Sequence, residues 1–295
     1  MPSLNDAPML SMAGDIRFDI VVADALQRQM RPFRRWSHEV RLRQGLGLRG
    51  PAHALLADMH GVWAWAPGDR YAAAKRHGSV REWMRAHAGS DVRLWVSAEF
   101  TQSIEDVASL PPRDDARLRS HARQAFVDKH GNEAATWPLA TWHNDVARGV
   151  VALAGIDLDA LRRHGEQNDV RIRSVEPWWH HAFLEAKRCA PVLVQAANAH
   201  VCVVEGRAAA WITLARGVMS HVRRCVLEDA SVAALRETIT RLNADRSDGD
   251  VPVVVLGQGL VDGGDTSRLD AHVLGRLDGD QPPQWLRPAT RNEVH

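Results

Sequence analysis

Apolar segments of strand length follow one another in the second half of the chain, and this feature restricts the fold most strongly. They are the runs PVLVQAA, AHVCVVEG, AAAWITLARG and VMSHVRRCVL, which start at Pro191. Turn signals at Glu205-Gly206 and Arg216-Gly217 separate them, so they predict a meander of extended segments. Because helical patterns stand on both sides of the meander, the sequence predicts a mixed α/β fold.

The chain before the meander alternates predicted strands and helices. AHALLADMHGVWAWAPGD predicts a β-hairpin that turns at His60-Gly61 and places Trp63 and Trp65 on one face. Ser79 and Asp157 are predicted N-caps of helices. The other predicted strands cover residues 16–22, 92–98, 137–142, 149–156, 170–175 and 251–260, and the other predicted helices cover 113–130, 178–188 and 231–245.

Composition places the chain among ordinary folded proteins. Its 295 residues suffice for one large bilobal domain or for two smaller domains that share an interface. Apolar residues make up 45% and charged residues 25%, values far from those of a disordered chain. Lys and Arg (37) nearly balance Asp and Glu (36), so no overall field attracts nucleic acid, and nucleic-acid binding is not expected.

The sequence also predicts the compartment. We find no basic and apolar secretory leader, and no run approaches the roughly 18 apolar residues that cross a bilayer. Cys189, Cys202 and Cys225 are odd in number and stand in apolar sequence, which predicts buried side chains in a reducing compartment rather than disulfides. We therefore expect a soluble cytoplasmic protein without a transmembrane segment of its own.

Two clusters are candidate partner-binding residues. Arginines gather in one stretch together with Phe33 and Trp36; they are Arg28, Arg31, Arg34, Arg35, Arg41, Arg43 and Arg49. This stretch is either a solvated helical face or a contact for an acidic partner, lipid headgroups or phosphates, with Arg31, Arg34, Arg35 and Trp36 as its candidate contacts.

The second cluster is Trp178-Trp179. Consecutive residues point in different directions from a helix, so one ring is expected in the core and the other is a candidate contact for a partner. The alternative buries both rings between two lobes.

The order of elements resembles that of a known family. The segments that carry the resemblance are LLADMHGVWAW, RLWVSAEF, ASLPPRDDARLRSHARQAFVDKHG with WPLATW, GVVALAGIDLDALRRHGEQNDVRIRSVEPWW, the meander and VPVVVLGQGL. From about Ala54 to Leu260 the chain resembles the cytoplasmic actin-like domains of type II secretion L proteins (GspL) and type IV pilus M proteins (PilM). GspL proteins continue into a membrane helix, whereas this chain ends at His295, so it is more similar to PilM or is a truncated form.

The resemblance implies a fold and a role. The fold is α/β and bilobal, of the actin and sugar-kinase (ASKHA) type, with mixed sheets flanked by helices. The implied divisions are an N-terminal arm with the basic segment (1–50), a first lobe (51–190), a second lobe (191–280) and a tail (281–295). The implied role is a cytoplasmic platform at the inner membrane that binds an assembly or traffic ATPase and the short cytoplasmic tail of a bitopic membrane protein, with homo-oligomers as a further expectation.

Two predicted turns are candidates for binding phosphate. Actin-like enzymes hold phosphates on two β-hairpin turns that carry Asp, Gly and Ser or Thr, because backbone N–H groups must approach the oxyanions and the Asp positions Mg²⁺. The first candidate, DMHGV at residues 58–62, keeps Asp58 and Gly61 but has bulky residues beside them. The second candidate, AANAH at residues 196–200, has neither Asp nor Gly. We therefore expect no enzyme activity and no catalytic residue.

Two glycine-rich segments remain. Gly257 and Gly259, after the predicted strand at 251–260, are candidate nucleotide-binding residues for ATP in a degenerate loop, although glycines at such a turn also serve packing. GLGLRG at residues 45–50 matches the dinucleotide fingerprint in letters only. Because Pro51 and a hairpin follow it in place of a helix, we interpret it as a hinge.

Metal sites are not expected. No Walker motif, Gly-x-Ser-x-Gly elbow or His-Glu-x-x-His pair occurs, and no Cys/His set has zinc spacing. Asp245, Asp248 and Asp250 lie together, but the Glu that ends a calcium loop does not follow.

Three hypotheses follow. The leading hypothesis is a non-enzymatic scaffold of a type IV pilus or type II secretion-like platform. The first rival is a divergent ATP-binding actin-like protein that uses Gly257 and Gly259. The second rival is a nucleic-acid or lipid binder that uses the basic segment.

Overall fold

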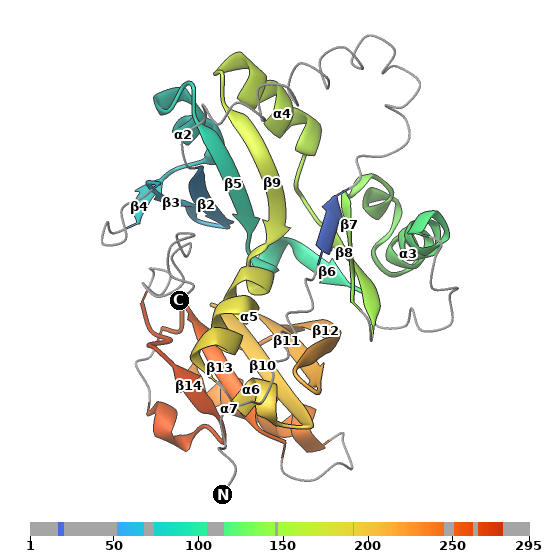
Figure 1. The fold of residues 1–295 in the computed structure, drawn as a ribbon, viewed down its shortest axis with the longest axis vertical. Coiled ribbons are helices and arrows are strands. Elements are labelled where there is room, and N and C mark those ends of the chain that lie inside the picture. The colour runs from blue at the N-terminus through green and yellow to red at the C-terminus, as the bar shows by residue number, and fades with distance from the viewer. Residues whose placement is uncertain are drawn as a thin grey trace, which may run out of the picture.

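The computed structural model describes residues 17–20, 52–67, 74–104, 115–144, 147–190, 192–244, 251–261 and 265–279. The basic segment, the glycine-rich segment at 45–50, the aspartates at 245–250 and the tail lie outside these ranges. The described chain forms three sheets with helices packed against them, which confirms the α/β class (Figure 1). None of the described helices is both long enough and apolar enough to span a membrane.

The first lobe is built on a five-stranded sheet of order β4-β3-β2-β5-β9. Its strands are β2 (His53–Asp58), β3 (Gly61–Trp65), β4 (Lys75–His77), β5 (Asp91–Val96) and β9 (Arg171–Pro177), and its helices are α2 (Val80–Ala86) and α4 (Leu158–Gln167). β2 is central: the antiparallel strands β3 and β4 lie on one side of it, and β5 and β9 continue parallel to it on the other. The predicted hairpin is therefore confirmed, and both Trp63 and Trp65 are buried.

The second lobe repeats this arrangement in the order β12-β11-β10-β13-β14. Its strands are β10 (Asn198–Glu205), β11 (Ala208–Ala215), β12 (Val218–Val226), β13 (Val253–Gln258) and β14 (His272–Leu274), and its helices are α5 (Trp178–Cys189), α6 (Val192–Gln195) and α7 (Val232–Ala244). β10 is central, with β11 and β12 antiparallel on one side and β13 and β14 parallel on the other. Two sheets of one topology agree with the bilobal α/β fold that the resemblance implied.

A third sheet is inserted into the first lobe between β5 and β9. Its order is β1-β7-β8-β6, and it packs against α3 (Asp115–His130). Its strands are β1 (Arg17–Ile20), β6 (Thr101–Ser103), β7 (Leu139–His143) and β8 (Arg148–Leu153), and the 3-10 helices η2 (Ala98–Phe100) and η3 (Asn132–Thr136) adjoin it. The sequence predicted strands at 137–142 and 149–156, which correspond to β7 and β8, but it did not predict a separate sheet.

Local sequence signals account for the helix starts. The hydroxyl of Ser79 accepts a hydrogen bond from the N–H of Glu82 at 3.1 Å, and Glu82 Oε2 accepts one from the N–H of Gly78 at 2.9 Å. Asp157 Oδ1 likewise accepts the N–H of Ala160 at 2.8 Å. Both predicted N-caps are confirmed, because these side chains satisfy amides that have no partner within the helix.

One predicted strand is wrong. The run PVLVQAA, expected as the first segment of the meander, contains the short helix α6. The N–H of Ala196 donates to the carbonyl of Val192 at 3.0 Å, and Leu193 is fully buried. A short apolar run has the length of a buried strand and of a buried helical turn, so periodicity alone cannot separate them. The antiparallel meander therefore begins one segment later, at β10.

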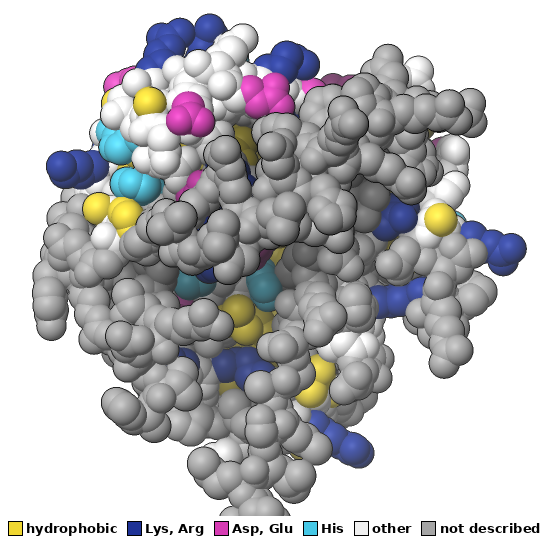
Figure 2. All heavy atoms as spheres, turned by 45° about the horizontal axis from the view of Figure 1, so that its top comes forward, with side chains coloured by type: hydrophobic (Ala, Val, Ile, Leu, Met, Phe, Trp, Pro, Cys, Tyr) yellow, Lys and Arg dark blue, Asp and Glu magenta, His cyan; other side chains and the backbone are white. Residues whose placement is uncertain are grey.

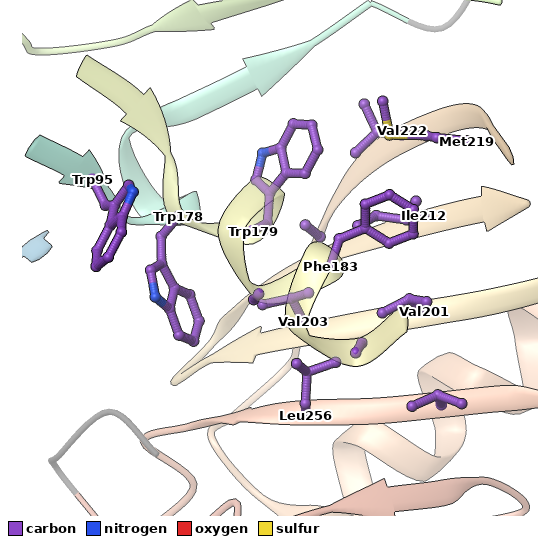
Figure 3. Packing of buried hydrophobic residues seen from close by; sticks show 14 of the residues in the cluster. Trp95, Trp178, Trp179, Phe183, Val201, Val203, Ile212, Met219, Val222 and Leu256 are labelled. Carbon is purple, nitrogen blue, oxygen red and sulfur yellow. The ribbon is translucent and has the colours of Figure 1, made fainter. Parts of the chain in front are cut away.

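A shared hydrophobic cluster joins the two lobes. It contains Trp95 of the first sheet together with Trp178, Trp179 and Phe183 of α5, and it extends over the second sheet. Figure 3 shows the rings of α5 above β10 and β11, with Trp178 on the side of Trp95. Although α5 falls within the predicted first lobe, it packs on β10 and β13 of the second sheet.

The cysteines follow their prediction only in part. Cys202 is buried and Cys225 is half-buried, but Cys189 is exposed. Cys189 is the last residue of α5, where the helix leaves the core, so the expectation of burial is wrong there. All three cysteines are free thiols.

We expect Phe183→Ala to lower the free energy of unfolding by about 3–5 kcal/mol, because Phe183 is 0% exposed and its removal leaves a cavity between the lobes. The neighbouring Leu184 is 45% exposed, so Leu184→Ala is the matched control and should cost less than about 1 kcal/mol. Urea unfolding of both variants gives the comparison. Equal losses in the two variants would contradict the packing of α5 on the second sheet.

Candidate functional site

The central strands of the two lobes both end in an acidic residue at the junction between the lobes. β2 ends at Asp58 and β10 ends at Glu205, and each acid directly precedes a hairpin turn. Glu99 of η2 is a third carboxylate there, since both it and Asp58 act electrostatically on Glu205. The arrowheads of β5 and β9 in Figure 1 point from the first lobe toward this junction. We take this junction as the candidate functional site.

Glu205 and Arg224 of the second lobe hold one residue of the first lobe from both sides. Glu205 Oε1 accepts a hydrogen bond from the N–H of Ala98 at 2.9 Å. Arg224 Nε donates to the carbonyl of the same residue at 3.0 Å. The backbone N–H of Arg224 also donates to the Ser103 hydroxyl at 3.2 Å. We call this arrangement the Ala98 clamp; it fixes the 3-10 helix η2 against the second lobe.

The clamp carboxyl has a strongly raised pKa. Burial, together with the charges of Glu99 and Asp58, raises the pKa of Glu205 to about 8. The N–H of Ala98 and the hydroxyl of Ser97 oppose this pKa shift without cancelling it. Burial also lowers the pKa of Arg224, while Glu99 acts in the opposite direction. A protonated carboxyl is a poor ligand for a divalent cation, which requires ionised oxygens.

The first predicted phosphate turn is where the sequence placed it, but carboxylates of this chain occupy its amides. Asp58 Oδ1 accepts the N–H of His60 at 2.7 Å, and Glu99 Oε2 accepts the N–H of Met59 at 3.2 Å. Asp58 Oδ2 accepts the indole N–H of Trp63 at 3.2 Å. Donors that would approach a phosphate oxygen are thus already bonded within the protein.

The second predicted phosphate turn was placed wrongly. Residues 196–200 do not form the hairpin turn; Asn198 to His200 already belong to β10. The turn of this hairpin follows Glu205 and contains Gly206 and Arg207. Because residues 192–195 form the helix α6 and not a strand, the first hairpin of the second lobe begins one segment later than predicted. The expectation that the second turn lacks an acid and a glycine is therefore wrong.

The second turn, like the first, is bonded within the chain. The N–H of Gly206 donates to the carbonyl of Gln258 at 2.9 Å, and the Glu205 side chain, only 5% exposed, is held in the Ala98 clamp. Within the described residues, no three His, Cys, Asp or Glu side chains are arranged to hold a metal ion. The turn donors and acids of this junction serve contacts between the protein's own segments.

Gly257 and Gly259 are required by close backbone contacts. A Cβ atom on Gly257 would lie 2.0 Å from the carbonyl oxygen of Val204, and one on Gly259 would lie 2.8 Å from the nitrogen of Gly206. Both glycines have positive φ angles, 140° and 82°. The N–H of Gly259 donates to the carbonyl of Gly279 at 2.9 Å. Packing explains both glycines, and their predicted role in nucleotide binding stays a prediction.

The predicted partner-binding residues divide into two groups. Trp178 and Trp179 are 0% and 1% exposed, so the expected exposed ring is wrong and the alternative, with both rings buried, holds. The large rings fill the cluster between the lobes, where they contribute to the core rather than to a surface. The other group, Arg31, Arg34, Arg35 and Trp36, lies outside the described residues.

Sequence reasoning missed Glu205, Arg224 and Glu99 as site residues. A signal for Glu205 exists in the repeated pattern of an apolar strand that ends in an acid before a glycine turn, LLADMHG and CVVEGR. No comparable signal marks Arg224 or Glu99, because their partners lie far away in the sequence.

Comparisons with known proteins give similarity at the level of the fold. Neither a protein-family model nor a curated protein matches the sequence. The cytoplasmic domain of EpsL, an inner-membrane component of the type II secretion system of Vibrio cholerae, is 12% identical; the match covers 70% of this chain and 82% of that one, with a TM-score of 0.44. The PilM-PilN type IV pilus biogenesis complex is 10% identical, with coverages of 78% and 91% and a TM-score of 0.46. A Bacteroides thetaiotaomicron protein with an actin-like ATPase fold is 9% identical, with coverages of 76% and 90% and a TM-score of 0.49.

We expect Gly257→Ala to destabilise the protein by more than about 3 kcal/mol, because its methyl group collides with the β10 backbone. Gly155→Ala is the matched control: Gly155 also has a positive φ, but nothing lies within 4 Å of its Cβ position. The control should cost only the strain of a left-handed residue, about 1–2 kcal/mol. Thermal and urea unfolding measure both. Similar losses in the two variants would mean that the contact of Gly257 with Val204 is not formed.

Glu205→Gln should change how stability depends on pH. In the wild type, the native Glu205 keeps its proton up to about pH 8, whereas the unfolded side chain loses it near pH 4.3. The free energy of unfolding should therefore fall as pH rises between these values. Glutamine can still accept the N–H of Ala98 but does not titrate. The variant should match the wild type near pH 5 and exceed it at pH 9 by a few kcal/mol, on the order of 1.4 per unit of pKa shift.

Urea unfolding between pH 5 and pH 9 measures this effect. Glu237→Gln on the exposed face of α7 is the control, and its curve should run parallel to that of the wild type. If Glu205→Gln keeps the pH dependence of the wild type, Glu205 is not the buried neutral acid described above.

Proposed function

We propose that this chain is a non-enzymatic cytoplasmic scaffold of an assembly platform like those of type IV pili and type II secretion. It connects an assembly ATPase to membrane subunits through the short cytoplasmic tail of a bitopic inner-membrane protein, and these partners keep it at the inner membrane. The observation that carries the non-enzymatic part is the bonding at the junction. Both hairpin turns use their amides and acids for contacts within the chain.

The chemistry of nucleotide hydrolysis explains why this bonding matters. A triphosphate needs backbone donors that point at its oxygens and an ionised acid that positions Mg²⁺. Here the amides of Met59 and His60 donate to Glu99 and Asp58, and the acid of the second turn is buried and neutral. Breaking these contacts to admit a ligand would leave buried polar groups without partners, which costs free energy.

A clamped junction suits a platform. The Ala98 clamp and the shared hydrophobic cluster join the lobes by polar and apolar contacts at once. Such a body can hold two partners at a fixed separation. The choice of a pilus or secretion machine comes from the resemblance in residues 54–260; EpsL and PilM carry names from such machines, and for this chain that role is our proposal.

The second candidate function is ATP binding by a divergent actin-like protein. The corrected second turn favours it, because Glu205 and Gly206 supply an acid and a glycine directly after the central strand, as Asp58 and Gly61 do in the first lobe. This function requires the Ala98 clamp to open and Glu205 to ionise.

A nucleic-acid or lipid binder is the third candidate, and its basic segment lies outside the described residues. Figure 2 shows the described Lys and Arg side chains dispersed over the visible face, with acidic side chains among them. Binding through Arg31, Arg34 and Arg35 would be steeply salt-dependent and would disappear when these arginines are replaced.

We expect millimolar Mg·ATP to leave the melting temperature of the full chain unchanged within about 1 °C, because the scaffold does not bind it. A ligand that binds only the native state would instead raise the stability by mass action. Differential scanning fluorimetry with ATP, with and without Mg²⁺, measures this directly, and phosphate release measures turnover. A saturable rise that requires Mg²⁺ would contradict the scaffold proposal and support the ATP-binding candidate.

The partner half of the proposal has its own experiment. A traffic ATPase and a bitopic inner-membrane protein from the same organism are co-expressed with the chain, and the complexes are purified through a tag on the chain. Retention of both proteins supports the scaffold. Retention of neither, with the chain folded, would overturn it.

A further inference from the structure

The outer edge of the inserted sheet is closed by a strand from a remote part of the chain. β1 pairs antiparallel with β7 in the register Arg17 with His143, Phe18 with Trp142, Asp19 with Thr141 and Ile20 with Ala140. Figure 1 shows β1 as the blue arrow beside β7, among segments from the middle of the chain. The next strand in the sequence, β2, belongs to a different sheet. Among the described residues, β1 is therefore separated in sequence from every other strand of its sheet.

The opposite edge of this sheet is closed differently. β6 pairs with β8, and its outer side lies beside β12 of the second lobe. The Ser103 hydroxyl of β6 accepts the N–H of Arg224 of β12 at 3.2 Å. The second lobe thus secures that side of the sheet within one copy. In the described part of the chain, the β7 edge is closed by a strand that is remote in sequence and stands at the end of the sheet order.

β7 cannot be left open without cost. Leu139, Ala140 and Trp142 of β7 are buried, so this strand belongs to the core of the inserted sheet. Without β1, its edge would present unpaired N–H and C=O groups, which readily pair with another extended chain. The sequence RFDI alternates polar and apolar residues and suits a strand at a sheet edge.

Residues 21–51 connect β1 to the rest of the chain, and their length allows β1 to come from the same molecule or from a neighbouring one, depending on local concentration. Residues 21–51 have a contour length of about 100 Å, enough to reach a neighbouring molecule. Pairing within one copy costs the entropy of closing a loop of this length, which limits the effective concentration of the strand at its own β7 edge to about a millimolar. Copies gathered side by side reach comparable local concentrations.

We propose that β1 pairs with the β7 edge of a second copy of this chain, so that strand exchange links copies. The same four residue pairs form in both arrangements, and only the donor molecule changes. Reciprocal exchange between two copies gives a closed dimer, and one-way donation gives an open row of copies. The expectation of homo-oligomers thereby acquires a specific contact.

Cysteine cross-linking in the full chain tests the proposal. Arg17→Cys and His143→Cys are introduced because the two residues are register partners at the end of the ladder, where Cα atoms lie within disulfide range. The exposed Cys189 is replaced by alanine to remove the background thiol. A tagged chain with Arg17→Cys is co-expressed with an untagged chain with His143→Cys, and the purified mixture is oxidised.

A covalent pair of tagged and untagged chains is the expected result, because only a strand donated by another copy joins these positions. Asp19→Pro in the tagged chain should reduce this pair at least tenfold, since proline removes an N–H from the ladder. The control for random collisions replaces His143→Cys by Asp159→Cys, an exposed site on α4, and should give no pair.

Two results would overturn the proposal. A chain that carries both Arg17→Cys and His143→Cys is oxidised in parallel. If it forms an internal cross-link while the mixture of single-cysteine chains forms no covalent pair, β1 stays within its own copy. The second is no cross-link in either sample, which would show that β1 and β7 do not pair. Neither result bears on the Mg·ATP measurement or on co-purification with partners, so the platform proposal is tested separately.

Discussion

The contact between Glu205, Ala98 and Arg224 is the constraint on which the arrangement of the lobes depends. Glu205 lies at the end of the central strand of the second sheet, and Ala98 begins the 3-10 helix that leads into the inserted sheet. Arg224 lies on β12, the strand that runs beside β6 of that sheet. Ala98 therefore connects the first lobe and the inserted sheet to the second sheet. If its two hydrogen bonds are removed, a buried carboxyl and a half-buried guanidinium lose their partners, which costs more than the bonds themselves contribute.

The same contact decides what the junction can do chemically. β2 ends at Asp58 and β10 ends at Glu205, and these two acids occupy equivalent positions in two sheets of the same topology. In one lobe the acid accepts the turn's own amide, and in the other it accepts an amide of the opposite lobe. Burial keeps the second acid protonated at neutral pH. The acids and turn amides of both lobes are thus engaged in contacts of the chain with itself.

Features that depend on neighbouring residues were predictable from the sequence. The Ser79 cap, the β2–β3 hairpin and helix α3 each follow from residues within a few positions of one another. The order of these elements sufficed to predict two actin-like lobes. By contrast, the pairing of β1 with β7 and the bond from Ala98 to Glu205 join positions more than 100 residues apart, and no local pattern encodes them. The short helix α6 failed for a different reason, because its apolar residues satisfy a strand and a helical turn equally well.

The passage from the first lobe to the second contains no loop. β9 ends at Pro177, and α5 begins at Trp178 and lies at once on the second sheet. Because proline has a fixed φ angle, the backbone has little freedom to rotate at this point. A pulling force applied to one lobe would therefore be transmitted to the other through a continuous strand and helix without slack.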